Sequence, residues 1–323
     1  MASKPEESGR RRIRAWIIRL CVSALLLAVI FTLVPFADVW AAARQISPLL
    51  WIGALGLFLA GHAAAAAKWR ILIGGGISYR QAFRAHLAGL AANLALPSVA
   101  GGDVVRAGLV MKHAHDKARL AVGSVADRLI DTLGLVLIAC AAGWIAWRPR
   151  LDSDIWMGWP LLGLLAVVAA GLAGAVVFDR FVSRREPSGK LMRLATKVIH
   201  SAAELVRSPG RLLLCLAISM AVQCLFVGIN IAFAEATHIE APVAAWFFAW
   251  TTAKIIAIAP ISLGGLGLRE ASMAALLVPF GADPAQVVAI GLVWQSVLYV
   301  SGLIGFLVQL QRPAPPKLTM ERS

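Results

Sequence analysis

Charged residues are scarce in this chain. They make up 15% of its 323 positions, whereas 59% of the residues are hydrophobic and the mean hydropathy is +0.77. Soluble domains rarely exceed about half apolar residues, so this composition excludes an ordinary soluble globular protein. Several windows of about 20 residues carry almost no charge, which is the length that crosses a hydrocarbon core of roughly 30 Å. We therefore expect an all-α polytopic membrane protein.

Catalytic and metal-binding motifs are also lacking. The four cysteines form no CxxC pair, and the sequence contains no GxSxG, HExxH or Walker motif. His113 and His115 lie two positions apart, so they point away from each other on a helix, and no third ligand is near. We expect no metal, no cofactor and no catalytic residue. Transport, if it occurs, is expected to run downhill or on an ion gradient.

Acidic residues are few relative to basic ones: 17 against 31, a net charge of +14. No basic stripe alternates with aromatic residues in a segment that would fold in water, so nucleic acid is not an expected partner. In so apolar a chain, lysine and arginine are better explained as residues of cytoplasmic loops that touch anionic lipid headgroups. The expected partners are membrane lipids, and a homo-oligomer or a lipid-synthesis enzyme is a further candidate.

Apolar segments divide the chain into spans. Six segments are predicted to cross the membrane fully: about 15–36, 49–67, 121–146, 159–178, 212–234 and 285–310. Two more, about 80–111 and 242–280, are interrupted by proline and glycine. We expect these two to be re-entrant elements, since non-helical backbone at membrane depth is tolerated only inside the protein or beside a wet cavity. Tight loops between full spans are the alternative.

The two interruptions match each other. Pro97, Gly101, Gly102 and Arg106 have the same spacing as Pro260, Gly264, Gly265 and Arg269, with an offset of 163 residues. The same offset places span 49–67 on 212–230 and span 121–146 on 284–309. This indicates an internal duplication, with repeats at about 49–146 and 212–309.

Positive charge predicts the orientation of these repeats. Residues 1–14 form a basic tail that is expected in the cytoplasm, ahead of an uncleaved first span. Lys68 and Arg70, the segment 179–211 and the tail 311–323 are then also cytoplasmic. Within 179–211, apolar residues at helical spacing predict an amphipathic helix at about 187–211, on the membrane surface or in solvent. The two repeats run in opposite directions, a plan that recurs in secondary transporters of the bacterial inner membrane.

Charges inside the membrane are candidates for function. The breaks supply Asp103, Arg106, Arg269 and Glu270, and Lys254 precedes the second break. Arginine forks, together with helix N-termini that follow the glycine pairs, suit the oxygens of a lipid phosphate. The alternative is structural: Arg106 with Asp103 and Arg269 with Glu270 neutralise each other. At the cytoplasmic end of span 121–146, Asp127, Arg128 and Asp131 are expected to form either an interfacial ion-pair cluster or a proton relay.

Three blocks carry a family resemblance: "NLALPSVAGGDVVRAGLV", "ADRLID" and "PISLGGLGLREA". Together and in this order they resemble the lysylphosphatidylglycerol synthase transmembrane (flippase-like) family, some members of which are linked to hopanoid lipids. The resemblance assigns the family's motif positions to residues of this chain: Asn93, Pro97, Gly102, Asp103, Arg106, Asp127, Arg128, Asp131, Pro260, Gly264, Gly265, Gly267 and Glu270. Ser262-Leu263 replaces the second proline of the last block.

The resemblance implies the flipping module without the aminoacyltransferase domain that some members carry. The first hypothesis is therefore a transporter that moves a phospholipid, aminoacyl-lipid or hopanoid-type lipid across the membrane. Arg106, Arg269, Glu270, Asp103, Lys254 and Asn93 would bind its headgroup. A membrane-embedded enzyme or enzyme subunit of glycolipid or polyprenyl-phosphate synthesis is the second hypothesis, and a non-catalytic organiser of a lipid-synthesis complex is the third.

Overall fold

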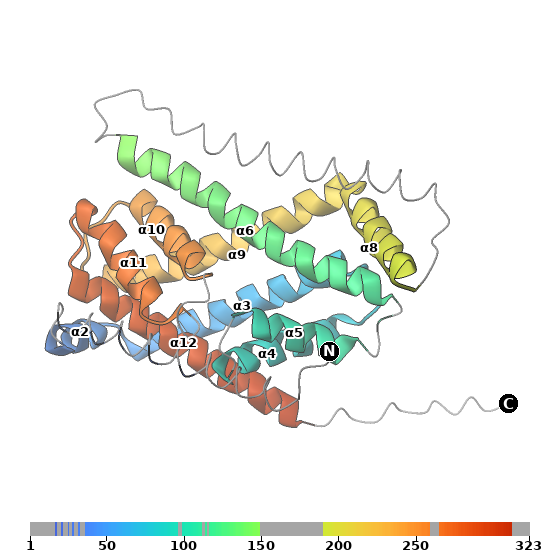
Figure 1. The fold of residues 1–323 in the computed structure, drawn as a ribbon. Coiled ribbons are helices and arrows are strands. Elements are labelled where there is room, and N and C mark those ends of the chain that lie inside the picture. The colour runs from blue at the N-terminus through green and yellow to red at the C-terminus, as the bar shows by residue number, and fades with distance from the viewer. Residues whose placement is uncertain are drawn as a thin grey trace.

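The protein is described here by a computed structural model, in which residues 36–95, 99–111, 114, 116–148, 190–258 and 265–311 are placed, with five single positions before residue 36. These residues form helices and connecting turns, with no strand among them. The fold is all-α, as predicted (Figure 1). Spans 15–36 and 159–178, Pro97, Pro260, Gly264, His113, His115 and the tail after residue 311 fall wholly or almost wholly outside the described residues.

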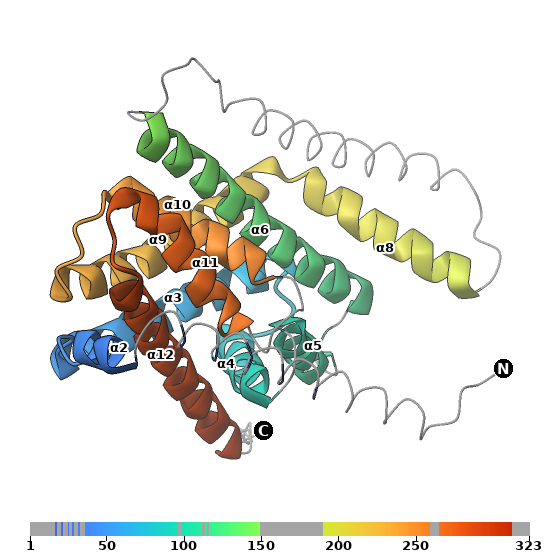
Figure 2. The ribbon, with the colours of Figure 1, turned by 60° about the vertical axis from the view of Figure 1, so that its left-hand side comes forward.

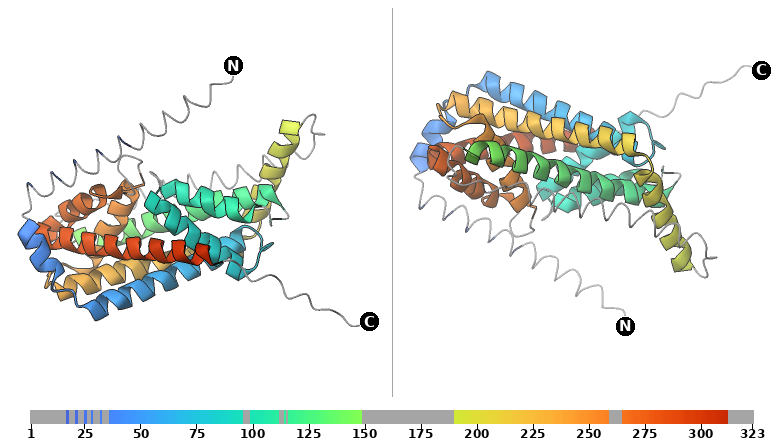
Figure 3. Two further views of the ribbon diagram at one scale, coloured as in Figure 1. Left: turned by 90° about the horizontal axis from the view of Figure 1, so that it is seen from below. Right: turned by 90° about the horizontal axis from the view of Figure 1, so that it is seen from above.

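Among the described residues, four helices are long and apolar enough to cross a membrane. They are α3 (Pro48–Leu72), α6 (Lys117–Trp147), α9 (Pro209–Ala236) and α12 (Pro284–Leu310). They coincide with four of the six predicted spans, so the prediction of these spans is confirmed. Figure 3 shows them lying side by side along one direction.

The starts of these helices follow from short polar caps and proline. Ser47 Oγ accepts the Leu50 amide at 3.2 Å ahead of α3, and Asp283 accepts the Gln286 amide at 3.0 Å ahead of α12. In both helices a proline occupies the first turn, where it loses no hydrogen bond. Asp116 caps α6 in the same way. Each long span therefore starts at a position fixed by its own sequence.

The two interrupted segments form pairs of short helices. The first pair is α4 (Tyr79–Ala95) with α5 (Val99–Val110), and the second is α10 (Val243–Ile256) with α11 (Leu268–Leu277). The four helices have 17, 12, 14 and 10 residues, fewer than the roughly 20 needed for a full crossing. Within each pair the two helices pack against each other. Each pair is thus a hairpin of two short helices.

The contacts between helices repeat with the sequence. Helix α4 packs against α12, and its counterpart α10 packs against α6, the counterpart of α12. The hairpin of each repeat is therefore seated on the last span of the other repeat. Helices α3 and α9 pack against each other. Every one of these pairings has a partner related by the 163-residue offset, so the duplication extends to the packing.

The two repeats are inverted. Phe58 of α3 stacks on Phe226 of α9 with ring centroids 5.0 Å apart, while further along α3 the carbonyl of Lys68 meets Cys215 Sγ at 4.0 Å. Residue numbers rise in α3 as they fall in α9, so the two equivalent spans are antiparallel. Accordingly, Figures 1 and 3 place α4–α5 and α10–α11 toward opposite ends of the long helices.

The core joins the repeats through aromatic rings. Phe58, Phe226, Trp250 and Trp294 come from four different helices, and their adjacent centroids lie 5.0–6.4 Å apart. The amphipathic segment forms α8 (Lys190–Val206), which packs on α6 and α9 and projects from the bundle near the start of α6 (Figures 2 and 3). A short helix, α2 (Phe36–Ala43), and a single 3-10 turn, Val278–Phe280, complete the described chain.

Candidate functional site

A buried ammonium group lies between two carboxylates of α6. Lys68 Nζ is 3.0 Å from Asp127 Oδ1 and also pairs with Asp131, and Lys68 is only 1% exposed. Asp127 and Asp131 lie one turn apart on α6, so both reach the same side of the helix. A charge this deeply buried is tolerated only when it is paired. Lys68 therefore belongs to the interior of the bundle, and it lies on α3 itself because this helix continues to Leu72, five residues beyond the predicted span.

Arg106 connects the first hairpin to the same carboxylates. Its NH2 lies 2.9 Å from Asp127 Oδ2 and 3.2 Å from Asp103 Oδ1, and its guanidinium is 4.5 Å from the centre of the Trp69 ring. Arg106 is 3% exposed. An ion pair combined with a ring face is the environment that suits a planar guanidinium.

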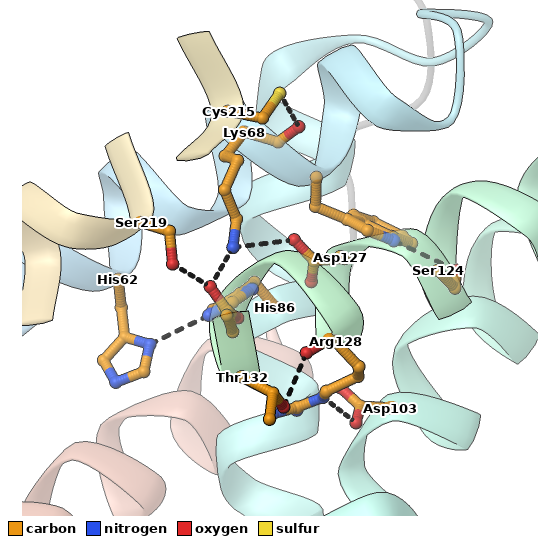
Figure 4. A network of polar contacts seen from close by, with 12 residues as sticks. His62, Lys68, His86, Asp103, Ser124, Asp127, Arg128, Thr132, Cys215 and Ser219 are labelled. Atoms are coloured by element: carbon orange, nitrogen blue, oxygen red, sulfur yellow. Dashed lines mark hydrogen bonds and ion pairs between the residues drawn. The ribbon is translucent and has the colours of Figure 1, made fainter. Parts of the chain in front are cut away.

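Arg128 completes the cluster from the more exposed side. It forms a bidentate pair with Asp103, and Ser219 of α9 donates to Asp131 Oδ1 at 2.5 Å. We call the six charged residues the charge network: Lys68, Asp103, Arg106, Asp127, Arg128 and Asp131. Figure 4 labels four of them, Lys68, Asp103, Asp127 and Arg128. It contains three cations and three anions and is neutral as a whole. It joins α3, α5 and α6, which the sequence separates by up to 63 residues.

Two histidines extend the charge network toward the middle of α3. His62 Nδ1 and His86 Nε2 are 2.8 Å apart (Figure 4). His86 Nδ1 lies 3.1 Å from Arg106 NH1. We call His62 and His86 the imidazole pair. It is half-buried, and the ring of His62 packs near Phe58 and Phe226, with centroids 4.4 and 5.5 Å away.

The second hairpin has its own ion pair. Arg269 NH2 lies 2.5 Å from Glu270 Oε1 and 3.0 Å from Gln295 Oε1 of α12, while Glu270 Oε2 accepts the amide of Gly267 at 2.8 Å. Glu270 is fully buried. Gly267 has φ of +81°, a conformation in which a side chain would be strained. Glu270 therefore balances Arg269 and closes the start of α11 at once.

The helix start at the first break differs from the prediction, whereas α11 begins after its glycine pair as predicted. Helix α5 begins at Val99, before the glycine pair and not after it, and the Gly102 amide donates to Asn93 Oδ1 at 3.0 Å. Gly102 also packs directly on the Gly89 carbonyl, which leaves no room for a Cβ. One amide at each break is thus satisfied by the protein's own side chain, Asn93 at the first and Glu270 at the second. An anion at these helix starts would find fewer donors than the glycines suggest.

Lys254 has a different environment from the other buried cations. Its Nζ donates to Gln223 Oε1 at 2.8 Å and lies 4.8 Å from the Trp250 ring and 5.6 Å from the Phe226 ring. Among the described residues, no carboxylate is paired with it. Lys254 is half-buried and stands at the end of α10, directly before the second break. Lys254 is thus a half-buried cation without a described acidic partner.

The two repeats have diverged at the network positions. The 163-residue offset maps Lys68 to Ile231, Asp127 to Ile290 and Asp131 to Trp294. Ile290 is fully buried and Trp294 belongs to the aromatic core. The positions equivalent to Lys68, Asp127 and Asp131 are therefore apolar or aromatic in the second repeat.

Sequence reasoning identified the acidic members of this site and both arginines of the breaks. It did not identify Lys68, His62, His86, Ser219 or Trp69. A signal existed for His62, which is a polar residue close to the middle of a 25-residue apolar helix. For Lys68 the signal was hidden, since a lysine next to a predicted helix end is indistinguishable from a loop residue.

Comparison with known proteins gives one match. The family model described as "Lysylphosphatidylglycerol synthase TM region" matches residues 16–305, which is most of the chain. No curated protein sequence matches it. The matched region includes all the helices that carry the charge network, the imidazole pair and Lys254.

Proposed function

Since the chain belongs to the lysylphosphatidylglycerol synthase transmembrane family, and is accordingly a multi-pass membrane protein of lipid-related function, we propose that it moves a lipid with a phosphate-bearing headgroup between the leaflets of the inner membrane. The observation that carries this proposal is the inverted pair of short-helix hairpins, each seated on the last span of the other repeat. In such a plan, tilting one repeat against the other opens a central site alternately to the two sides.

The interior supplies surfaces for both parts of a lipid. The charge network lies on the first hairpin's side, and the aromatic core and apolar counterpart positions lie on the other. Lys254 is the described cation best placed to meet a phosphate, because its contacts are an amide oxygen and two ring faces rather than a carboxylate. Arg106 and Arg269 are each already paired with a carboxylate, so we expect them to contribute to the electrostatic potential around the headgroup rather than to bind it directly.

The same geometry disfavours the enzymatic alternative. A general acid or base needs a carboxylate that is not already committed, and both Asp127 and Asp131 are bound to the Lys68 ammonium. Asp131 accepts a further bond from Ser219. The sequence left two roles open for Asp127, Arg128 and Asp131, a proton relay or an ion-pair cluster. These contacts support the ion-pair role.

Reconstitution tests the proposal. The purified protein is placed in vesicles that carry a trace of acyl-labelled lipid, and a membrane-impermeant quencher reports the fraction of label in the outer leaflet over time. We expect faster leaflet exchange than in empty vesicles for phosphatidylglycerol, and slower exchange for the Lys254→Met variant than for Glu235→Gln, whose parent side chain is exposed at the end of α9. Exchange equal to that of empty vesicles for anionic, zwitterionic and cationic lipids would exclude a lipid transporter.

A further inference from the structure

We propose that the imidazole pair, His62 with His86, binds one proton together with an anionic lipid headgroup, so that the proton is the coupling ion of transport. The inference rests on the proposed function for its role in transport, but the joint binding of proton and headgroup is a separate property. It starts from the hydrogen bonds of the two rings.

The bonds fix where the hydrogens lie in the neutral pair. A guanidinium can only donate, so His86 Nδ1, which is 3.1 Å from Arg106 NH1, is an acceptor and carries no hydrogen. The hydrogen of neutral His86 is therefore on Nε2, from which it donates to His62 Nδ1 at 2.8 Å. His62 then holds its own hydrogen on Nε2. Arg106 thus orients both rings through one chain of donors and acceptors.

An additional proton cannot enter this chain without breaking it. The nitrogen that could take a proton between the two rings is His62 Nδ1, but it already accepts the N–H of His86. If His86 instead shifts its hydrogen to Nδ1, that hydrogen faces the Arg106 guanidinium. Either way two donors oppose each other. Protonation must therefore separate His62 from His86 or His86 from Arg106.

The bonds at risk connect parts that alternating access would move. His62 lies on α3, His86 on α4 and Arg106 on α5, so the pair joins a full span to both helices of the first hairpin. The hairpin is rigid within itself, because Gly89 and Gly102 meet backbone to backbone and Asn93 ties the two helices. Breaking the His62–His86 bond would remove one of the contacts between α3 and the hairpin, while the Tyr79 hydroxyl bond to the Ala63 carbonyl and the Arg106–Trp69 ring contact remain.

The surrounding charges link the proton to an anion. The charge network is neutral, and Lys254 adds one positive charge without a described acidic partner. A proton on the pair adds another, in a poorly solvated interior where like charges repel strongly. An anionic headgroup lowers that cost, and by linkage the proton raises the affinity for the headgroup by the same factor. Proton and lipid would therefore bind together and cross in the same direction.

Each helix packed against the pair contributes to this balance. Helices α9 and α12 face it with few titratable groups: α9 presents the Phe226 ring to His62, and Tyr299, half-exposed, is the titratable residue of α12. The charged groups that act on the pair come from the other helices: Lys68 (α3), Arg106 (α5), Arg128 and Asp131 (α6), and Lys254 (α10).

Two measurements test the inference. In the first, vesicles with acyl-labelled phosphatidylglycerol receive a pH gradient while valinomycin and equal potassium hold the membrane potential at zero. One proton per lipid predicts that a gradient of about one pH unit shifts the leaflet ratio by up to about tenfold, toward the alkaline side. Labelled phosphatidylcholine, whose headgroup carries its own cation, should not respond.

In the second measurement, calorimetric titration of the detergent-solubilised protein with short-chain phosphatidylglycerol is repeated in buffers of different ionisation enthalpy. Proton uptake approaching one per bound lipid is expected for the wild type. His62→Gln and His86→Gln retain hydrogen-bonding capacity but cannot titrate, so uptake and gradient response should vanish. His200→Gln, on the exposed side of α8, is the matched control and should keep both.

The outcomes separate the two proposals. Leaflet exchange without gradient response or proton uptake overturns the inference and leaves the proposed function intact. Proton-linked lipid binding without any leaflet exchange supports joint binding and overturns the transport function. Unchanged uptake in both glutamine variants also overturns the inference. If a variant does not fold, judged by size exclusion and thermal unfolding, the wild-type calorimetry alone still decides whether a proton accompanies the lipid.

Discussion

Asp127 of α6 lies 2.9 Å from Arg106 of α5, and this contact joins a full span to the first hairpin in the interior of the bundle. Both side chains are almost fully buried. Lys68 of α3 lies on the other oxygen of the same carboxylate. A single acidic group therefore holds three helices together, and its removal leaves two buried cations without their shared partner.

We expect Asp127→Asn to be one of the most destabilising single changes in the protein. Breaking a buried ion pair by removing one partner costs about 3–5 kcal/mol, since the remaining charge stays desolvated. In detergent, the thermal unfolding temperature of Asp127→Asn should be markedly lower than that of Glu235→Gln, which removes an exposed carboxylate. Equal unfolding temperatures for the two variants would mean that the pairs around Asp127 do not stabilise the fold.

Two glycines of α5 should respond oppositely to alanine. A Cβ at Gly102 would overlap Asn93 Oδ1 and lie 2.5 Å from the Gly89 carbonyl, whereas a Cβ at Gly108 would meet nothing within 4 Å. Gly102→Ala should cost about 1–3 kcal/mol by overpacking the hairpin. Gly108→Ala should be neutral or stabilise by about 0.5–1 kcal/mol, because alanine is the better helix former. The same unfolding assay compares the two variants, and a similar loss of stability in both would contradict close packing at Gly102.

Two variants of Glu270 should separate its charge balance with Arg269 from its capping of α11. Its carboxylate balances Arg269 and also accepts the Gly267 amide. Glu270→Gln keeps an acceptor for the amide but leaves the guanidinium uncompensated, while Glu270→Ala removes both contacts. We expect both to destabilise, with Ala worse by about 1–2 kcal/mol, the range for losing a helix cap. Chemical unfolding of both variants measures the difference, and no gap between them would argue against the cap.

Lys254→Met should lower lipid exchange more than it lowers stability. Methionine fills similar space beside Trp250 and Phe226, and it removes a half-buried cation that has no described acidic partner. Losing a charge-assisted contact of about 1.5–3 kcal/mol predicts a decrease of about tenfold or more in exchange of an anionic lipid. The unfolding temperature should stay the same or rise. Full activity in Lys254→Met would remove this lysine from the proposed headgroup site.

Much of the fold was accessible from sequence because it depends on local chemistry. The uncharged windows around Phe58 and Phe226 specify long helices whatever else the chain does, and Ser47-Pro48 and Asp283-Pro284 mark where two of them begin. The repeated Pro-Gly-Gly-Arg spacing revealed the duplication, and basic residues indicated that its halves are inverted. Helix ends were less accessible: the predicted end of span 49–67 and the predicted start of α5 were both wrong by a few residues.

What sequence alone determined here is the set of membrane elements, their duplication and the residue types available to a site, since these follow from hydropathy and spacing along the chain. Partners were decided only by tertiary structure. Asp127 binds Lys68 and Arg106, which lie 59 and 21 residues before it, and His62 meets His86 across two helices. Buried charges and imidazoles choose partners by three-dimensional proximity in a poorly solvated interior, and that proximity is set by how α3, α4, α5 and α6 pack.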